Sequence, residues 1–288
     1  MNNIQPEVTR RSALLSLGAI GLAAVAPTFA EAEPPLQAIT DEDIFNFALN
    51  LESLETEYYL RGTAGHGMSG SDVGPNPGPV HGGSMVPWEN QDLRMFMEEV
   101  AQNELAHVRF YRRTLGRRAV SRPEIDLAGG FRAAAKAAGL GDDFDPFASE
   151  MNFFLGGMLM EDVGVTLYNG AAPLIKRKDY LQAAAGILAV EAYHMGMARS
   201  TLFRMGSEAR HAANAISNAR DSLDGGADLD QGIEVNGKAN FVPTDKDAKA
   251  FVRTPYQGLR IVYLTDKPGV SGGGMFPKGM NGRLRTTR

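Results

Sequence analysis

Two segments, Glu104-Leu105-Ala106-His107 and Glu191-Ala192-Tyr193-His194, each place a glutamate three residues before a histidine. Residues three apart lie on the same face of a helix, so each segment would present a carboxylate and an imidazole side by side. Both groups bind transition metals in proteins. The two segments therefore predict two helices that direct metal ligands toward a common interior.

A third pair with the same spacing, Glu208 and His211, begins farther along the chain, and His211 follows His194 by 17 residues. That separation is about 25 Å along a continuing helix. We expect this pair to be a solvated surface pair. His66 and His81 lie in a glycine-rich segment, and we expect both to be exposed.

Two further glutamates, Glu52 and Glu161, stand among apolar residues in two other predicted helices. A carboxylate that points into a bundle core is costly unless it is paired or bound to a metal. One glutamate from each of two helices and one Glu-x-x-His pair from each of the other two is the ligand set of di-iron and di-manganese carboxylate bundles. The alternative is a buried network of salt bridges without a metal, although no lysine or arginine recurs at matching positions on these faces.

Other polar residues share the predicted helix faces. Tyr59, Tyr111 and Tyr168 each follow one of these glutamates by seven residues, which is two helical turns. We expect them near the ligands, where their hydroxyls would hydrogen-bond the carboxylates; the alternative is that they are ordinary core aromatics. Glu55, three residues after Glu52, is an alternative ligand or a residue just outside the ligand set.

Apolar residues recur at spacings of three and four through most of the chain, which predicts an all-α fold. Four long helices with a connection of about 30 residues in the middle predict a four-helix bundle with a long crossover. Thr40 is the expected N-cap and Gly62 the expected stop of the first helix, and Arg253 is expected to clamp the tail onto the bundle. The expected helices are 41–61, 90–115, 147–171 and 178–205, with short helices at 131–138 and 207–221.

The remaining segments are predicted to be mostly irregular. The stretch 62–87 is rich in glycine and proline and should be a long loop. The tail from residue 222 carries similar clusters and one alternating run at 259–264, so we expect little regular structure there. The predicted organisation is a leader at 1–32, a bundle at 39–206 and a C-terminal extension at 207–288 that packs on the bundle.

The N-terminus reads as a twin-arginine signal peptide. Arg10 and Arg11 precede an uncharged run to about Ala26, and the small residues Ala30 and Ala32 follow as cleavage positions. The apolar run is shorter than the ~20 residues of a membrane-spanning helix, so no permanent membrane anchor is expected. The sequence predicts a periplasmic or secreted protein that uses the twin-arginine translocase during export.

Composition narrows the chemistry further. The 288 residues carry a net charge of -5, which argues against nucleic acid as a partner. The absence of cysteine excludes disulfides, thiolate zinc sites, iron–sulfur clusters and cysteine nucleophiles. Any metal must therefore be held by histidines and carboxylates.

The sequence resembles the ferritin-like superfamily, in a branch of bacterial exported proteins related to plant desiccation-related proteins. The resemblance runs from about residue 40 to the end of the chain. The segments that carry it are NFALNLESLETEYY at 46–59, NELAH at 103–107, EDVGVTLY at 161–168, EAYH at 191–194, AFVRTPYQ at 250–257 and GGMFPKGMNG at 273–282.

This resemblance implies a ferritin-like bundle with two iron or two manganese ions. The predicted metal ligands are Glu52, Glu104, His107, Glu161, Glu191 and His194. The implied function is reaction with oxygen or peroxide in stress defence. The main alternative is a non-catalytic desiccation or stress protein that sequesters metal; a storage cage and an oxygenase with an organic substrate are further readings. Metal identity and the state of any homo-oligomer stay open.

Overall fold

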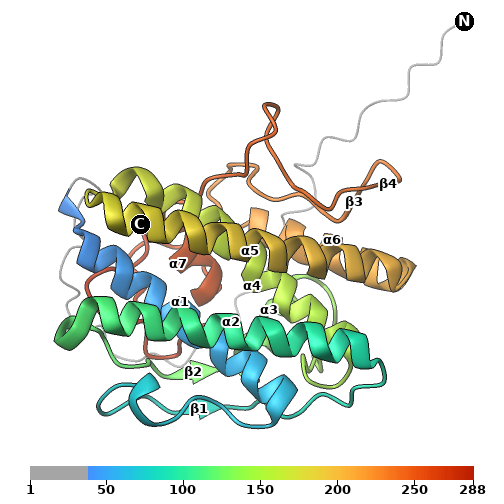
Figure 1. Cartoon of the computed structure of the whole chain (residues 1–288). Helices are drawn as coiled ribbons and strands as arrows, with labels where there is room; N and C mark the ends of the chain where they lie inside the picture. The colour runs from blue at the N-terminus through green and yellow to red at the C-terminus, as the bar shows by residue number, and fades with distance from the viewer. Residues whose placement is uncertain (1–37) are drawn as a thin grey trace, which may run out of the picture. The chain divides into compact units, whose positions relative to one another are not determined.

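Four long helices form a bundle in the computed structural model, which describes residues 38–288 (Figure 1). The first packs mainly on the second and the third mainly on the fourth, and a crossover joins the two pairs. The predicted all-α bundle is confirmed, and the predicted leader lies outside the described residues. The four helices are α1 (Asp41–Ala64), α2 (Gln91–Leu115), α4 (Glu150–Ala171) and α5 (Lys178–Arg204).

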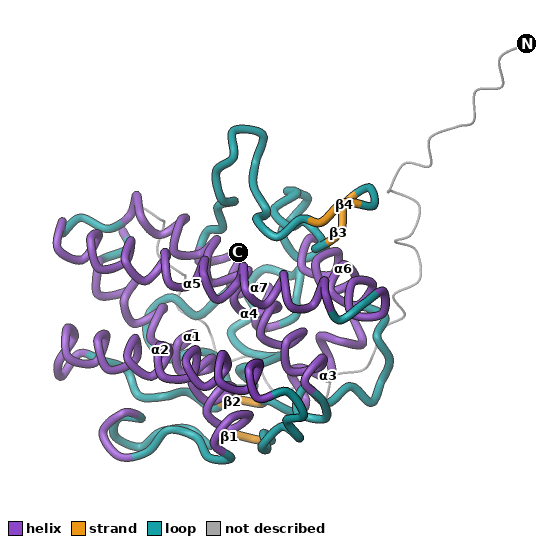
Figure 2. The backbone as a smooth tube through the Cα atoms, turned by 45° about the vertical axis from the view of Figure 1, so that its right-hand side comes forward, coloured by secondary structure: helices purple, strands orange, loops and turns teal. Residues whose placement is uncertain are grey.

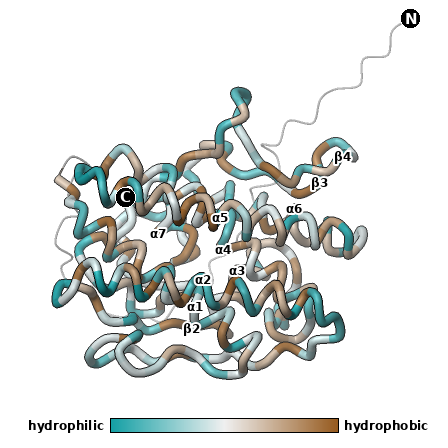
Figure 3. The backbone as a smooth tube through the Cα atoms, in the orientation of Figure 1, coloured by the Kyte–Doolittle hydropathy of each residue, from teal (hydrophilic) through white to brown (hydrophobic). Residues whose placement is uncertain are grey.

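The core lies between the two helix pairs. Colours for polar and apolar residues alternate along α2 in Figure 3, as expected of a helix with one face on the core. Helix α4 is buried on most sides because it also contacts the C-terminal elements. Within the described residues, no helix has the length and apolar character that crossing a membrane requires.

Local side chains explain where the helices begin. Thr40 accepts a hydrogen bond from the backbone N–H of Asp43, whose carboxylate accepts from the Thr40 N–H in return, so the predicted N-cap is confirmed. Helix α4 begins at Glu150, later than the predicted residue 147, because the Ser149 hydroxyl caps it by accepting from the Asn152 N–H.

The end of α1 corrects the prediction. Gly62 lies inside the helix, which stops instead at Gly65, where φ is 75°. A Cβ at Gly62 would lie 2.2 Å from Cε2 of Phe153, so this glycine permits close packing of α1 on α4. Gly65 supplies the left-handed conformation that ends a helix. The sequence shows two glycines three residues apart, and only the packing partner distinguishes their roles.

The loop between α1 and α2 lies along the crossover. Strand β1 (Val80–His81) pairs in parallel with β2 (Ile125–Asp126), and the crossover also contains the short helix α3 (Gly129–Ala137). The tube in Figure 2 shows how much of this region is loop. Short 3-10 helices of three residues each are also present. One, η2 (Gly70–Asp72), lies in the loop after α1, while η3 (Gly116–Arg118) follows α2 and η4 (Ala172–Leu174) follows α4.

The C-terminal extension holds more regular structure than predicted. Helix α6 (Ser207–Asp221) matches the expected short helix, and β3 (Glu234–Val235) pairs with β4 (Lys238–Ala239) in an antiparallel hairpin. The expectation of an irregular run at 259–264 is wrong, because helix α7 (Pro255–Tyr263) covers most of it. Seven of its nine residues are buried, and its polar face is only Gln257 and Arg260; the capping box of Thr254 and Gln257, with Pro255 at the first helical position, is the start signal that the alternating run hid.

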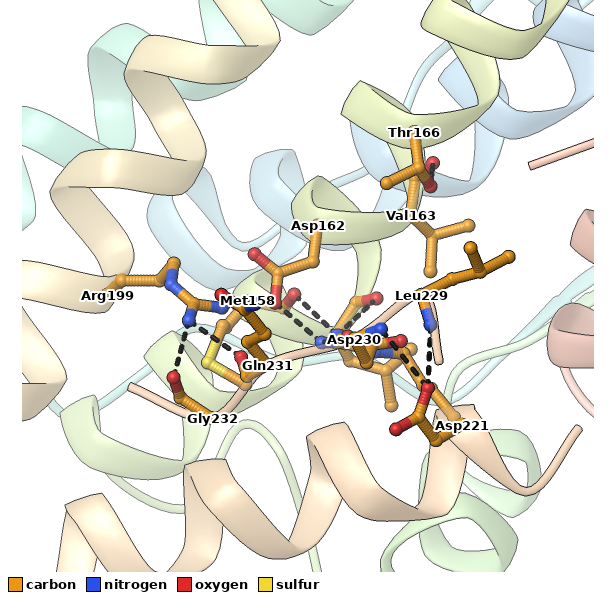
Figure 4. A network of polar contacts seen from close by, with 12 residues as sticks. Met158, Asp162, Val163, Thr166, Arg199, Asp221, Leu229, Asp230, Gln231 and Gly232 are labelled. Atoms are coloured by element: carbon orange, nitrogen blue, oxygen red, sulfur yellow. Dashed lines mark hydrogen bonds and ion pairs between the residues drawn. The ribbon is translucent and has the colours of Figure 1, made fainter. Parts of the chain in front are cut away.

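A buried network of ion pairs fastens this extension to the bundle (Figure 4). Asp162 of α4 accepts hydrogen bonds at Oδ2 from Arg199 at 2.8 Å and from Arg220 at 2.5 Å. Arg253 of the tail donates to Asp224 at 2.9 Å and to the Thr166 hydroxyl at 3.0 Å on α4. Asp230 completes the network through Arg220 and Arg253. Arg253 thus clamps the tail as expected.

Replacing Arg253 by alanine should lower the free energy of unfolding by about 3–5 kcal/mol, because the buried carboxylate of Asp224 would lose its cationic partner and that of Asp230 would lose one of two. The matched control is Arg283→Ala, whose ion pair with Asp43 at 3.3 Å is exposed and should matter little. Urea unfolding monitored by circular dichroism measures both changes. Equal stability of the two variants would contradict a stabilising role for the network.

Candidate metal centre

The six predicted ligands converge in the middle of the bundle. One carboxylate comes from α1 and one from α4, while α2 and α5 each supply a glutamate and a histidine. All six side chains are buried, which a bundle core tolerates only when each charge has a partner. The converging residues are Glu52, Glu104, His107, Glu161, Glu191 and His194.

The six residues form two overlapping groups whose oxygen and nitrogen atoms lie within 4.8 Å of one another. Glu104 and Glu191 belong to both groups. One group is completed by Glu52 and His107, and the other by Glu161 and His194. Each group could hold a metal ion, with the two shared carboxylates lying between the groups.

The distances in the two groups are similar. Nδ1 of His107 donates to Glu52 Oε2 at 3.1 Å and to Glu104 Oε2 at 3.2 Å. Nδ1 of His194 lies 3.0 Å from Glu104 Oε1 and 3.4 Å from Glu161 Oε2. The geometry at His194 Nδ1 is unsuitable for hydrogen bonds, so its contacts with Glu104 and Glu161 are purely electrostatic. Glu104 is therefore the carboxylate that both imidazoles contact.

Tyrosine hydroxyls support the carboxylates across the bundle. Tyr59 donates to Glu161 Oε1 at 2.6 Å, and Tyr168 donates to Glu52 Oε1. The pairing is reciprocal, because Tyr59 follows Glu52 and Tyr168 follows Glu161 by seven residues. Tyr111 lies 2.7 Å from the Tyr168 hydroxyl and, since Tyr168 gives its proton to Glu52, Tyr111 is the donor. Tyr59 and Tyr168 thus contact the cluster directly, as expected, and Tyr111 reaches it only through Tyr168.

Burial and charge shift the acid–base behaviour of the carboxylates. Burial raises the pKa of Glu52 to about 7, and burial with repulsion from Glu104 and Glu161 raises the pKa of Glu191 well above its ordinary value. Burial also acts to raise the pKa of Glu104, but the hydrogen bond from His107 and the close positive charges of both His107 and His194 outweigh it and hold that pKa far below the usual range.

The neighbouring carboxylates raise the pKa values of both imidazoles. Burial acts to lower the pKa of His107, but the charge of Glu52 and the hydrogen bond to Glu104 raise it to about 11. Burial likewise acts to lower the pKa of His194, but the negative charges of Glu161 and Glu104 raise it to about 10. Without a cation, this excess of buried negative charge keeps both imidazoles protonated at neutral pH.

Several ligand atoms have no hydrogen-bond partner among the described residues. Both carboxylate oxygens of Glu191, Oε1 of Glu104, Oε2 of Glu161 and Nδ1 of His194 are buried in this state. Buried polar atoms without partners are rare in folded proteins because each costs free energy. Of the eight such side-chain atoms among the described residues, these five belong to the two groups, and oxygen and imidazole nitrogen suit iron, manganese or zinc. The residues present therefore fit a metal site.

The structure also places the residues around this cluster. Glu55 is buried, and its pKa is raised well above the ordinary value by burial and by the charges of Glu104 and Glu52, but it belongs to neither group. Asn103 contacts His194, with Nδ2 at 3.2 Å from Nε2; no spacing in the sequence singles it out. Four residues predicted from the sequence to be exposed are exposed and belong to neither group: His66, His81, Glu208 and His211.

Comparison with known proteins agrees with this geometry. The profile of the ferritin-like domain family matches residues 40–204, which is more than half of the chain. The chain belongs to the ferritin-like domain family. Among its relatives are the ferritin-like catalase Nec2 of Nesocodon mauritianus, 29% identical over 85% of this chain and 84% of the relative, and the desiccation-related protein PCC13-62 of Craterostigma plantagineum, 28% identical over 76% of each. No solved structure matches the chain with significance.

Metal binding to this ferritin-like cluster should release protons, because a metal requires neutral imidazoles and both pKa values lie above neutrality. The apparent affinity for Mn²⁺ should rise by about tenfold per pH unit for each imidazole that deprotonates, between about pH 6 and pH 8. Calorimetry in buffers of different ionisation enthalpy counts the released protons. Binding without proton release would contradict the assignment of His107 and His194 as ligands.

Proposed function

We propose that this protein binds two iron or two manganese ions in the cluster and decomposes hydrogen peroxide. The observation that carries the proposal is the pair of overlapping ligand groups with buried, unpartnered oxygens and nitrogen. Four carboxylates, Glu52, Glu104, Glu161 and Glu191, would balance the charge of two divalent cations. The relative named a ferritin-like catalase supports peroxide as the substrate.

The residues have distinct parts in holding the ions. Glu52 with His107 would hold one ion and Glu161 with His194 the other, and Glu104 and Glu191, which belong to both groups, are available to either ion. When bound, the two ions would serve as a redox centre that accepts and returns electrons, and as Lewis acids that polarise a peroxide oxygen. In the net reaction one peroxide loses two electrons and two protons to become dioxygen. The other peroxide gains them as its O–O bond breaks, and two waters form.

The tyrosines hold protons beside the cluster. Burial raises the pKa of Tyr59, Tyr111 and Tyr168 well above the ordinary value, so their hydroxyls remain neutral donors. Tyr168 fixes Glu52 through its donated proton, and Tyr111 fixes Tyr168. Such partners orient the ligands of a metal site and adjust their basicity.

We also propose that the protein acts outside the cytoplasm. The Arg10-Arg11 motif and the apolar run after it support export through the twin-arginine translocase, with cleavage near Ala30 or Ala32. That route carries proteins already folded, so the metals would be loaded before export. A periplasmic or secreted enzyme of this kind would remove peroxide as part of stress defence.

The second candidate is a protein that sequesters metal without turnover. The relative named a desiccation-related protein favours it. Such a protein would keep the same cluster and would bind metal equally well. Only redox turnover separates the two functions.

Purified protein should contain about two iron or manganese ions per chain by mass spectrometry, matching the two ligand groups. Glu191→Gln keeps the side-chain volume but removes a charge that both groups share, so it should lose at least one ion. Glu208→Gln is the matched control, because it removes a glutamate from an exposed Glu-x-x-His pair. Metal contents that are equal in both variants and the wild type would contradict the site.

The metal-loaded protein should evolve dioxygen from hydrogen peroxide at an oxygen electrode. Tyr168→Phe removes the donor to Glu52 and should lower the rate by about 10- to 100-fold. Tyr193→Phe serves as the control, because Tyr193 lies between Glu191 and His194 but is 73% exposed. A fully loaded wild type that leaves peroxide intact would exclude the catalytic function and favour sequestration.

A further inference from the structure

An apolar cavity of about 50 Å³ adjoins the cluster at Glu52 and Glu55. Its walls come from α1, α2, α4, α5 and α7 and from Met275, so the C-terminal extension closes part of it. Nearly all of the lining is aliphatic or aromatic carbon. The lining includes Ala48, Glu52, Glu55, Tyr168, Ala184 and Ile261.

The cavity reaches the cluster itself. Glu52, a predicted ligand, and Glu55 both line it, together with Tyr168. Gly164 of α4 lies at the junction, where a Cβ would come within 2.5 Å of Glu191 Oε2 and 3.7 Å of Glu55 Oε1. The lack of a side chain at Gly164 therefore keeps space beside both carboxylates.

The surroundings of the two histidines are more polar. His107 and His194 keep small exposed fractions, 10% and 5% of their side chains, whereas Glu104 and Glu191 keep none. Asn103, which is only partly buried, contacts His194. Neither histidine lines the apolar cavity. The cluster thus meets the solvent at its histidines and the apolar cavity at Glu52 and Glu55.

We infer that this cavity is a binding site for dioxygen. An apolar lining favours a molecule that forms no hydrogen bonds and disfavours hydrogen peroxide, which has two donors and would lose its hydration. The volume suits a diatomic molecule but is about a third of the ~150 Å³ cavity that admits benzene. A bulky organic substrate is therefore excluded from it.

The inference rests on the proposed function for its physiological role. Peroxide decomposition makes one polar product, water, and one apolar product, dioxygen. Peroxide enters and water leaves on the histidine side, while dioxygen passes Gly164 into the apolar cavity. Residues of α7 such as Ile261 give the C-terminal extension a part in this site, because they form its outer wall.

Crystals of the full metal-loaded protein, pressurised with xenon and separately with dioxygen, test the inference without peroxide. Xenon marks apolar gas sites and is located by its anomalous scattering. Wild-type crystals should show xenon, and density for dioxygen, in the cavity next to Glu55 and Ala184. Ala184→Leu should abolish both, because the larger side chain fills the space.

The matched control is Ala185→Leu, which makes the same change at the neighbouring, exposed position of α5 and should leave xenon in place. Ala48→Leu fills the cavity from α1 and replaces Ala184→Leu if that variant does not fold. Ordered water in the wild-type cavity, or xenon found only elsewhere, would overturn the inference. Gas in the cavity of a protein without catalase activity would keep the gas site and reject the proposed function.

Discussion

The burial of carboxylates inside one helix bundle is the constraint on which the rest of this structure depends. Glu52, Glu55, Glu104, Glu161 and Glu191 are all buried, and within residues 38–288 the counter-charges that contact them are the imidazoles of His107 and His194. Charge buried in this way destabilises a fold unless hydrogen bonds and cations compensate it. The tyrosine hydroxyls provide part of the compensation, while burial and the charges of Glu104 and Glu161 still raise the pKa of Glu191 well above its ordinary value. A bound cation would therefore stabilise the fold as well as supply chemistry.

The bundle meets this constraint in two similar halves. Each half contributes a glutamate, a tyrosine seven residues later and a Glu-x-x-His pair, and each tyrosine binds the glutamate of the other half. The halves are not identical. Tyr111 extends the hydrogen bonds at Glu52, whereas position 198 in the second half is alanine. The apolar cavity also adjoins Glu52 but not Glu161, so the two metal positions would differ in their surroundings.

Much of this could be read from the sequence because local patterns specify it. Helical spacing located the long helices, and the Glu-x-x-His spacing located the ligands. Features that depend on contacts between distant segments could not be predicted from the sequence. Gly62 was mistaken for a helix stop because its partner Phe153 lies 91 residues away. Helix α7 was missed because the alternation at 259–264 outweighed the capping box of Thr254 and Gln257 that starts the helix. The shared position of Glu104 and Glu191 follows only from how the helices cross.

The central claim is that two metal ions lie between these helices. X-ray diffraction at the absorption edges of iron and manganese, from crystals of protein purified from its source cells, tests it most directly. The account predicts two anomalous peaks, one beside Glu52 and His107 and one beside Glu161 and His194, with the carboxylates of Glu104 and Glu191 between them. Crystals with no peak at either position, in which the imidazoles remain paired only with carboxylates, would contradict it.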